Sequence, residues 1–187
     1  ELKLSTGESL EYVAGKLVVA ADPVEGVFDP AACGGYAYCD ACKGEPVLWT
    51  ALTAETASTI ADGESHHYYL ADNFDDAGTA SMLFYLKTSA ANKLCLHLNG
   101  KTLTTGRKIV VEAGHMNLIG GENGKIVFNN RNKKTSNHGI NATGGTVNIY
   151  GGTYTYEPVE GATENAVISA SRGVTIRNAN IESILLG

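Results

Sequence analysis

The chain has 187 residues, with 22 glycines, 4 prolines and 4 cysteines, and 14 basic against 20 acidic residues give a net charge of −6. A chain of this length suits one domain, or one domain with a smaller appendage, and can bury a hydrophobic core. The net negative charge argues against a nucleic-acid-binding protein, which would need a basic surface. No apolar run reaches the roughly 18 residues that span a bilayer. We therefore expect neither nucleic acid nor membrane insertion.

The N-terminal third reads as short strands separated by turns. Residues 10–13 and 15–21 are a plausible strand pair with a turn at Ala14-Gly15, and the Asp-Pro pairs at 22–23 and 29–30 mark further turns. A loop rich in Cys, Gly and Tyr follows at residues 31–48. Beyond it, two apolar and aromatic stretches predict strands at 66–70 and 82–86.

The loop carries a possible metal site. Cys33, Cys39 and Cys42 follow the spacing C-x5-C-x2-C, and its last pair has the spacing of a zinc knuckle. A tetrahedral site needs a fourth ligand, for which we take His67, with His66 as the alternative. One disulfide within the loop explains the same cysteines, and a redox pair is disfavoured because no thioredoxin-like βαβ pattern surrounds it. We expect Cys95 to point outward from the coil or to partner the loop.

An acidic stretch at residues 72–76 offers three carboxylates and one amide. Such hard oxygen ligands suit calcium, but the stretch does not match the twelve-residue calcium loop. A solvated turn is the favoured interpretation, with a calcium site as the alternative.

The second half contains a near-repeat. Four segments, at 96–100, 116–120, 147–151 and 174–178, alternate apolar and polar residues and end at Gly100, Gly120, Gly151 and Asn178, at offsets of 20, 31 and 27 residues. Repeats of this length built from alternating strands are typical of a solenoid. We therefore predict an all-β fold, a right-handed parallel β-helix, with further strands at 101–104, 125–128, 153–156 and 180–183 and at 108–111, 139–142 and 165–169.

Alignment of the four segments predicts which side chains stack from rung to rung. One inward column contains Leu96, Met116, Val147 and Val174, and the next contains Leu98, Leu118, Ile149 and Ile176. An outward polar ladder contains His97, Asn117, Asn148 and Thr175. Accordingly, we divide the chain into N-terminal strands, Cys-rich loop and cap at residues 1–92 and β-helix rungs at 93–187.

The ends of the chain suggest a processed or excised piece. It starts at Glu1 without a methionine or a leader, and it ends in an apolar stretch at 184–187 without a polar cap. Because a last rung exposes an unpaired edge, we expect either further residues beyond Gly187 or another chain on that edge.

Four motifs, in their order along the chain, carry a resemblance to a known group of proteins. They are Ala-Cys-Gly-Gly at 32–35, Leu-Trp-Thr-Ala at 48–51, Tyr-Tyr-Leu-Ala at 68–71 and Leu-Cys-Leu-His-Leu-Asn-Gly at 94–100. Over residues 31–187 the sequence resembles the β-helix regions of large secreted surface proteins of anaerobic Gram-positive gut bacteria, and in fold alone it is similar to pectin-lyase-like enzymes. The resemblance implies an extracellular location and adhesion or polysaccharide contact.

The predicted outer faces of the rungs contain no Asp or Glu, whereas a glycoside hydrolase needs two carboxylates roughly 5 to 10 Å apart. Sugar binding is better supported, because Tyr150, Tyr154 and Tyr156 could form an aromatic strip with Arg177 nearby. The alternative is that some of these tyrosines face inward.

Three functions are consistent with these patterns. The first is a non-catalytic extracellular surface or adhesion module that contacts polysaccharide, with zinc as a structural cofactor. The second is a structural subunit that stacks end to end with other copies of itself in a fibre. The third is a fragment of a polysaccharide lyase or glycoside hydrolase.

Overall fold

The computed structural model describes residues 8–13, 16–21, 24–57, 65–87, 89–131, 138–157, 160 and 166–186. These residues form strands, turns and loops, and none of them is helical. In the described part of the chain there is accordingly no helix with the length and apolar character needed to cross a membrane. The chain divides into two compact units, Glu1–Thr50 and Ala51–Gly187.

The first unit begins with an antiparallel hairpin. Strand β1 (Glu8–Val13) pairs with β2 (Lys16–Ala21) so that Glu8 lies opposite Ala21. This pairing confirms the predicted strand pair, while its turn residues 14–15 lie outside the described residues.

The Cys-rich loop is organised around a tryptophan. Strands β3 (Tyr36–Ala37) and β4 (Val47–Leu48) pair antiparallel and bring the two ends of the loop together, ahead of β5 (Thr50–Ala51). Trp49 is buried, its indole Nε1 donates to the carbonyl of Ala37 at 3.2 Å, and the Phe28 ring meets it edge-on at 4.9 Å. The loop therefore has a small core of its own.

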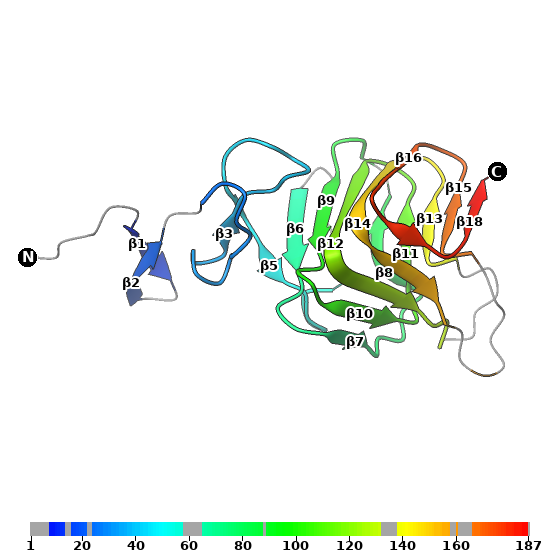
Figure 1. Ribbon diagram of the computed structural model, residues 1–187, viewed down its shortest axis with the longest axis horizontal. Helices are drawn as coiled ribbons and strands as arrows, with labels where there is room; N and C mark the ends of the chain where they lie inside the picture. The colour runs from blue at the N-terminus through cyan, green and yellow to red at the C-terminus, as the bar shows by residue number, and fades with distance from the viewer. Residues whose placement is uncertain are drawn as a thin grey trace, which may run out of the picture. The chain divides into compact units, whose positions relative to one another are not determined.

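The second unit is a parallel β-helix with three faces (Figure 1). Face A consists of β6 (Ser65–Tyr69), β9 (Lys93–His97), the first parts of β12 (His115–Phe128) and β14 (Thr146–Tyr156), and β16 (Val174–Arg177). Face B consists of β7 (Phe74–Asp76), β10 (Thr102–Thr105), the second parts of β12 and β14, and β17 (Asn180–Ile181). Face C consists of β8 (Met82–Leu86), β11 (Lys108–Val111), β13 (Ile140–Ala142), β15 (Ile168–Ala170) and β18 (Ile184–Leu186).

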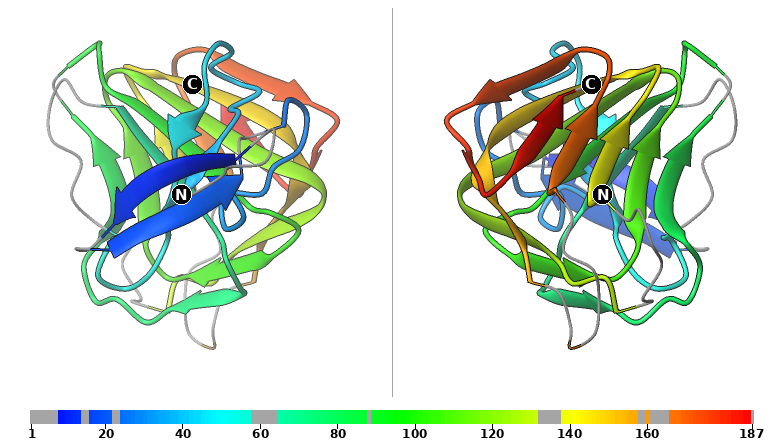
Figure 2. Two further views of the ribbon diagram at one scale, coloured as in Figure 1. Left: turned by 90° about the vertical axis from the view of Figure 1, so that its left-hand side faces the viewer. Right: turned by 90° about the vertical axis from the view of Figure 1, so that its right-hand side faces the viewer.

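Every strand pair within these faces is parallel, as a coil requires. In the right-hand view of Figure 2, the yellow-to-red strands β13, β15 and β18 of face C lie side by side. The predicted all-β fold, a parallel β-helix, is therefore confirmed, and the predicted second and third strands of the rungs are present.

The coil starts earlier than the boundary at residue 93 that the repeat predicted. Strands β6, β7 and β8 pair in parallel with β9, β10 and β11, so residues 65–86 form a first rung. The repeat does not reveal this rung because His66 and Tyr68 occupy the inward positions that aliphatic side chains fill in later rungs.

The predicted register is confirmed for three rungs and wrong for the one before them. Met116 aligns with Val147 and Val174, and the columns of Leu118 and of Asn117 follow as expected. In β9, however, Leu94 rather than Leu96 aligns with Met116, and Cys95 rather than His97 aligns with Asn117. The true register is thus shifted by two residues, which keeps inward and outward sides but changes which side chains are neighbours.

Face B carries two inward columns of different character. One is apolar apart from a single hydroxyl and contains Phe74, Leu103, Ile126, Tyr154 and Ile181. The other begins with two polar residues and contains Asp76, Thr105, Phe128 and Tyr156. The chain enters this face through corners with positive φ, including Gly100 (68°) and Gly151 (68°), where a side chain would be strained.

Tyr154 buries a hydroxyl without a partner. Its side chain is fully buried, and among the described residues its oxygen makes no hydrogen bond. Burial raises the pKa of this hydroxyl far above its ordinary value of 10, so it stays protonated. An unsatisfied buried hydroxyl costs about 1–3 kcal/mol.

We predict that Tyr154→Phe stabilises the protein by about 1 kcal/mol, because it removes the orphaned hydroxyl and keeps the ring. Urea unfolding followed by circular dichroism measures the change. The matched control is Tyr85→Phe, because the Tyr85 hydroxyl donates to Glu112 at 2.8 Å and its removal should bring no gain. A loss of stability in Tyr154→Phe would contradict the absence of a hydrogen-bond partner for this hydroxyl.

Candidate metal centre

The first outward column of face A brings a histidine next to a cysteine. It contains His67, Cys95, Asn117, Asn148 and Thr175 in successive rungs. Because side chains alternate along a strand, His66 points inward, where its ring lies 6.1 Å from that of Tyr68, and His67 points outward. Adjacent strands lie about 4.8 Å apart, so His67 and Cys95 can reach one ion.

The pair Cys39 and Cys42 is held by a tight turn. The backbone N–H groups of Cys42 and Lys43 both donate to the carbonyl of Cys39, at 3.1 and 2.9 Å. Lys43 and Gly44 then take positive φ angles of 57° and 108°, which end the turn. The spacing C-x2-C thus returns the second sulfur to the side of the first.

These two pairs form one group of possible ligands. One ligand atom from each of Cys39, Cys42, His67 and Cys95 lies within 4.8 Å of the other three. The group contains three of the four residues that the sequence analysis proposed as ligands. Cys33 is not in it, and Cys95 takes its place.

The donor set fits zinc. Around a tetrahedral zinc ion, with Zn–S of about 2.3 Å and Zn–N of about 2.0 Å, neighbouring ligand atoms lie roughly 3.3–3.8 Å apart. The ligand atoms of the group lie within 4.8 Å of one another, which is compatible with these separations. Three sulfurs with one imidazole are a known structural zinc set.

Cys95, which was expected to point outward or to partner the loop, was not predicted as a ligand because of the two-residue register shift. The predicted alignment put His97 into the outward column, and the true one puts Cys95 there, next to His67. The signal was present in the sequence, since Leu94 and Leu96 match the pair Met116 and Leu118 as well as Leu96 and Leu98 do.

The second outward column of face A contains Tyr69, His97, Ile119, Tyr150 and Arg177. Here the guanidinium of Arg177 lies 5.9 Å from the centre of the Tyr150 ring, so these two predicted sugar-binding residues are neighbours. His97 is half-buried in this column, its Nδ1 accepts the N–H of Asn99 at 2.9 Å, and burial lowers its pKa to about 4.

The predicted strip of three tyrosines is wrong for two of them. Tyr154 and Tyr156 are 0% and 5% exposed and lie inside the coil. The corner at Gly151-Gly152, with φ of 68° and 86°, interrupts the alternation so that Thr153 and Thr155 face outward instead. A sugar ring outside the coil cannot stack on these two side chains.

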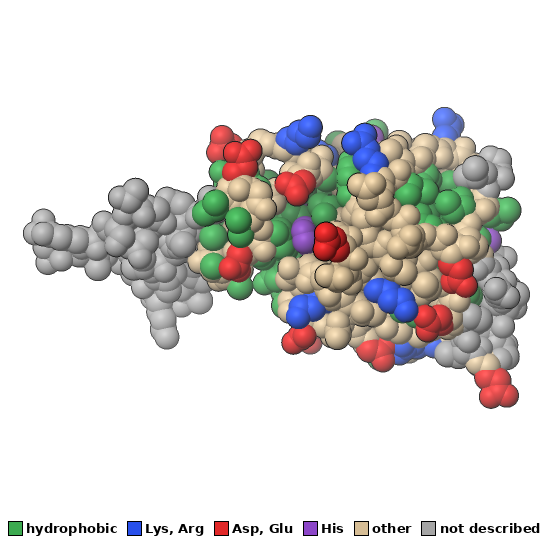
Figure 3. All heavy atoms as spheres, viewed as in Figure 1, with side chains coloured by type: hydrophobic (Ala, Val, Ile, Leu, Met, Phe, Trp, Pro, Cys, Tyr) green, Lys and Arg blue, Asp and Glu red, His purple; other side chains and the backbone are tan. Residues whose placement is uncertain are grey.

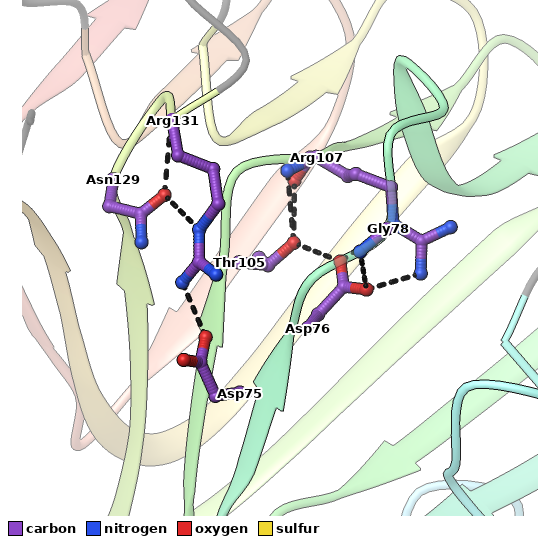
Figure 4. Close-up of polar contacts among 7 residues, drawn as sticks. All are labelled: Asp75, Asp76, Gly78, Thr105, Arg107, Asn129 and Arg131. Atoms are coloured by element: carbon purple, nitrogen blue, oxygen red, sulfur yellow. Dashed lines mark hydrogen bonds and ion pairs between the residues drawn. The ribbon is translucent and has the colours of Figure 1, made fainter.

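The acidic stretch at 72–76 is tied to arginines (Figure 4). Buried Asp76 accepts hydrogen bonds from Arg107 Nε and Nη2, both at 2.6 Å, from Thr105 Oγ1 at 2.6 Å and from the Gly78 N–H at 3.0 Å. Asp75 pairs with Arg131, whose Nε also donates to Asn129 at 3.3 Å. Asp72 and Asn73 are exposed, which agrees with a solvated turn at the start of the stretch, whereas Asp76 is buried in β7, which corrects that interpretation at its end. Calcium binding by the stretch stays a prediction.

The environment of Asp76 stabilises its charged form. Burial alone would raise the pKa of Asp76, but the hydrogen bonds from Arg107, Thr105 and Gly78 outweigh it and hold the pKa below its ordinary value of 3.8. Gly78 also makes room for the pair, since a Cβ there would lie 2.6 Å from the Arg107 guanidinium carbon.

Comparisons with models of protein families, with curated proteins and with solved structures find no match to this chain.

We predict that Asp76→Asn destabilises the protein by about 3–5 kcal/mol, because it leaves the Arg107 charge buried without a counter-charge. The neighbouring Asp75→Asn is the matched control. Its partner Arg131 is more exposed, so its loss should change the free energy of unfolding by about 0–1 kcal/mol. Chemical denaturation of both variants measures the difference, and equal losses would contradict the buried pair.

The same pair predicts a pH dependence. Since the pKa of Asp76 is lower in the folded than in the unfolded protein, its contribution is complete above the ordinary value of 3.8 and is lost as the pH falls below it. Asp76→Asn should therefore lose less stability on acidification than the wild type does.

Proposed function

We propose that the chain is a non-catalytic binding module whose Cys39, Cys42, His67 and Cys95 side chains hold one structural zinc ion. The grouping of these four ligands within 4.8 Å is the observation that carries the proposal. A disulfide would use two of the three sulfurs and give no role to the third sulfur or to the imidazole. A zinc ion uses all four.

A structural role for zinc follows from the number of protein ligands. Catalytic zinc sites keep one position open for water or substrate, whereas four protein ligands close the site. Bound zinc would connect residues 39 and 42 to residues 67 and 95, which are distant in sequence, and so restrict the unfolded chain. We therefore expect the ion to contribute to folding rather than to a reaction.

The charges on face A favour binding over glycoside hydrolysis. None of the outward columns of this face, including that of Lys93, His115 and Thr146, contains a carboxylate in its described strands, and hydrolysis requires two. On the face drawn in Figure 3, acidic and basic side chains are scattered among hydrophobic and other uncharged surface. Such a surface suits an uncharged ligand better than a nucleic acid.

A polysaccharide is the ligand class that we propose for face A. Tyr150 offers an aromatic ring, and Arg177 beside it offers N–H donors to sugar hydroxyls. The extended side of a solenoid suits a long polymer. An extracellular location rests on the motif order in the sequence and is part of the same proposal.

We predict that the reduced protein, refolded with zinc, contains about one zinc ion per chain by mass spectrometric metal analysis. Cys39→Ser and Cys95→Ser should lose the ion, because each removes a ligand. Cys33→Ser is the matched control and should keep it, since Cys33 is outside the group. Removing zinc with a chelator should lower the melting temperature of the wild type.

Two results would contradict the zinc site. One is a folded wild-type protein that binds no zinc after thiol reduction. The other is a mass two hydrogens below that of the reduced chain, which would identify a disulfide among the same cysteines.

We predict that Tyr150→Ala weakens binding to an immobilised polysaccharide about tenfold, because the stacking ring is lost. A glycan array identifies the polysaccharide, and isothermal titration with an oligosaccharide of it measures the change. Tyr154→Phe is the control and should bind as the wild type does, since Tyr154 lies inside the coil. An array without any binding would count against the polysaccharide.

A further inference from the structure

The residue after Cys95 in the first outward column of face A is a hydrogen-bond donor to its sulfur. Asn117 aligns with Cys95, and its Nδ2 lies 3.2 Å from Cys95 Sγ. An amide nitrogen carries hydrogens and no available lone pair, so the sulfur is the acceptor. Both side chains are buried, with exposures of 4% for Asn117 and 0% for Cys95.

The next rung fixes the direction of this amide. Asn148 aligns with Asn117, and its Nδ2 donates to Asn117 Oδ1 at 3.0 Å. With its oxygen accepting from Asn148, the Asn117 amide turns its NH2 group toward Cys95. A buried amide is costly unless it is hydrogen-bonded, and here its two ends are bonded along the column.

The negative charge of the proposed metal centre explains why an N–H donor to the Cys95 sulfur would matter. Three thiolates and one Zn²⁺ sum to −3 + 2 = −1, and most of the group is buried. An N–H donor to a charged sulfur is stronger than one to a neutral acceptor and spreads the excess negative charge. Outer partners of this kind commonly change metal affinity 10- to 100-fold when they are removed.

We propose that Asn117 is a positioning residue of the metal centre, which holds the Cys95 sulfur by an N–H···S bond and is itself oriented by Asn148. The inference rests on the proposed zinc site. The alternative is that the two asparagines only stabilise the sheet through stacked amides, as asparagine ladders do. In that case, removing either would change the stability of the metal-free protein and leave metal affinity unchanged.

The test compares metal binding in Asn117→Leu, Asn148→Leu and Thr175→Val with the wild type. Zinc affinity is measured by competition with a chromophoric chelator, and cobalt substitution reports the sulfur-to-metal charge-transfer band. Asn117→Leu should lower zinc affinity about 10- to 100-fold and move the cobalt band to lower energy, because an unbonded sulfur gives up charge more easily. Asn148→Leu should show a smaller loss, and Thr175→Val, further along the column, should bind as the wild type does.

Asn117→Asp covers the case in which the leucine variant fails to fold. It keeps the shape of the side chain but replaces the donor with an oxygen next to the sulfur, so zinc affinity should fall at neutral pH. If the wild type binds neither zinc nor cobalt, the proposed zinc site fails. If the wild type binds and every folded Asn117 variant binds within about twofold of it with the same cobalt spectrum, the role of Asn117 alone is overturned.

Discussion

Parallel pairing between successive rungs places side chains of the same phase directly above one another, and each site in the solenoid follows from such a column. Aliphatic residues fill inward columns such as that of Leu118, Ile149 and Ile176. The backbone pairing sets which side chains are neighbours. The size and polarity of a side chain in one rung therefore restrict the side chains that can lie above and below it.

Polar side chains in these columns are tolerated because they form hydrogen bonds with partners from neighbouring rungs. Inside, Thr105 donates to Asp76 from the next rung, and Arg107 supplies the charge that a buried carboxylate needs. Outside, Asn148 and Asn117 form a chain of amides that ends at Cys95. The same vertical spacing of about 4.8 Å thus serves the hydrogen bond of Thr105 to Asp76 in one column and two possible metal ligands, His67 and Cys95, in another.

The sequence predicted the β-helix and the register of its later rungs because alternation was strict and each strand ended at Gly or Asn. In β9, Leu94, Leu96 and Leu98 alternate without a break, so two alignments bury leucine equally well. A shift by two residues keeps every side chain on its own side, and hydrophobic pattern alone cannot detect it. The inward direction of Tyr154 could not be predicted for another reason. Two glycines with positive φ stand between it and Ile149 and interrupt the alternation.

The four candidate metal ligands also differ in how well they could be predicted from nearby sequence. Cys39 and Cys42 were predictable because three-residue spacing and a tight turn bring them together whatever the rest of the chain does. His67 and Cys95 are neighbours only through the pairing of β6 with β9. A shift of β9 by two residues would replace the sulfur with the His97 imidazole, and would also remove the acceptor of Asn117. The grouping of the four possible ligands therefore depends on a single strand register, so the proposed zinc ion and the correct coiling of the first rungs would stabilise one another.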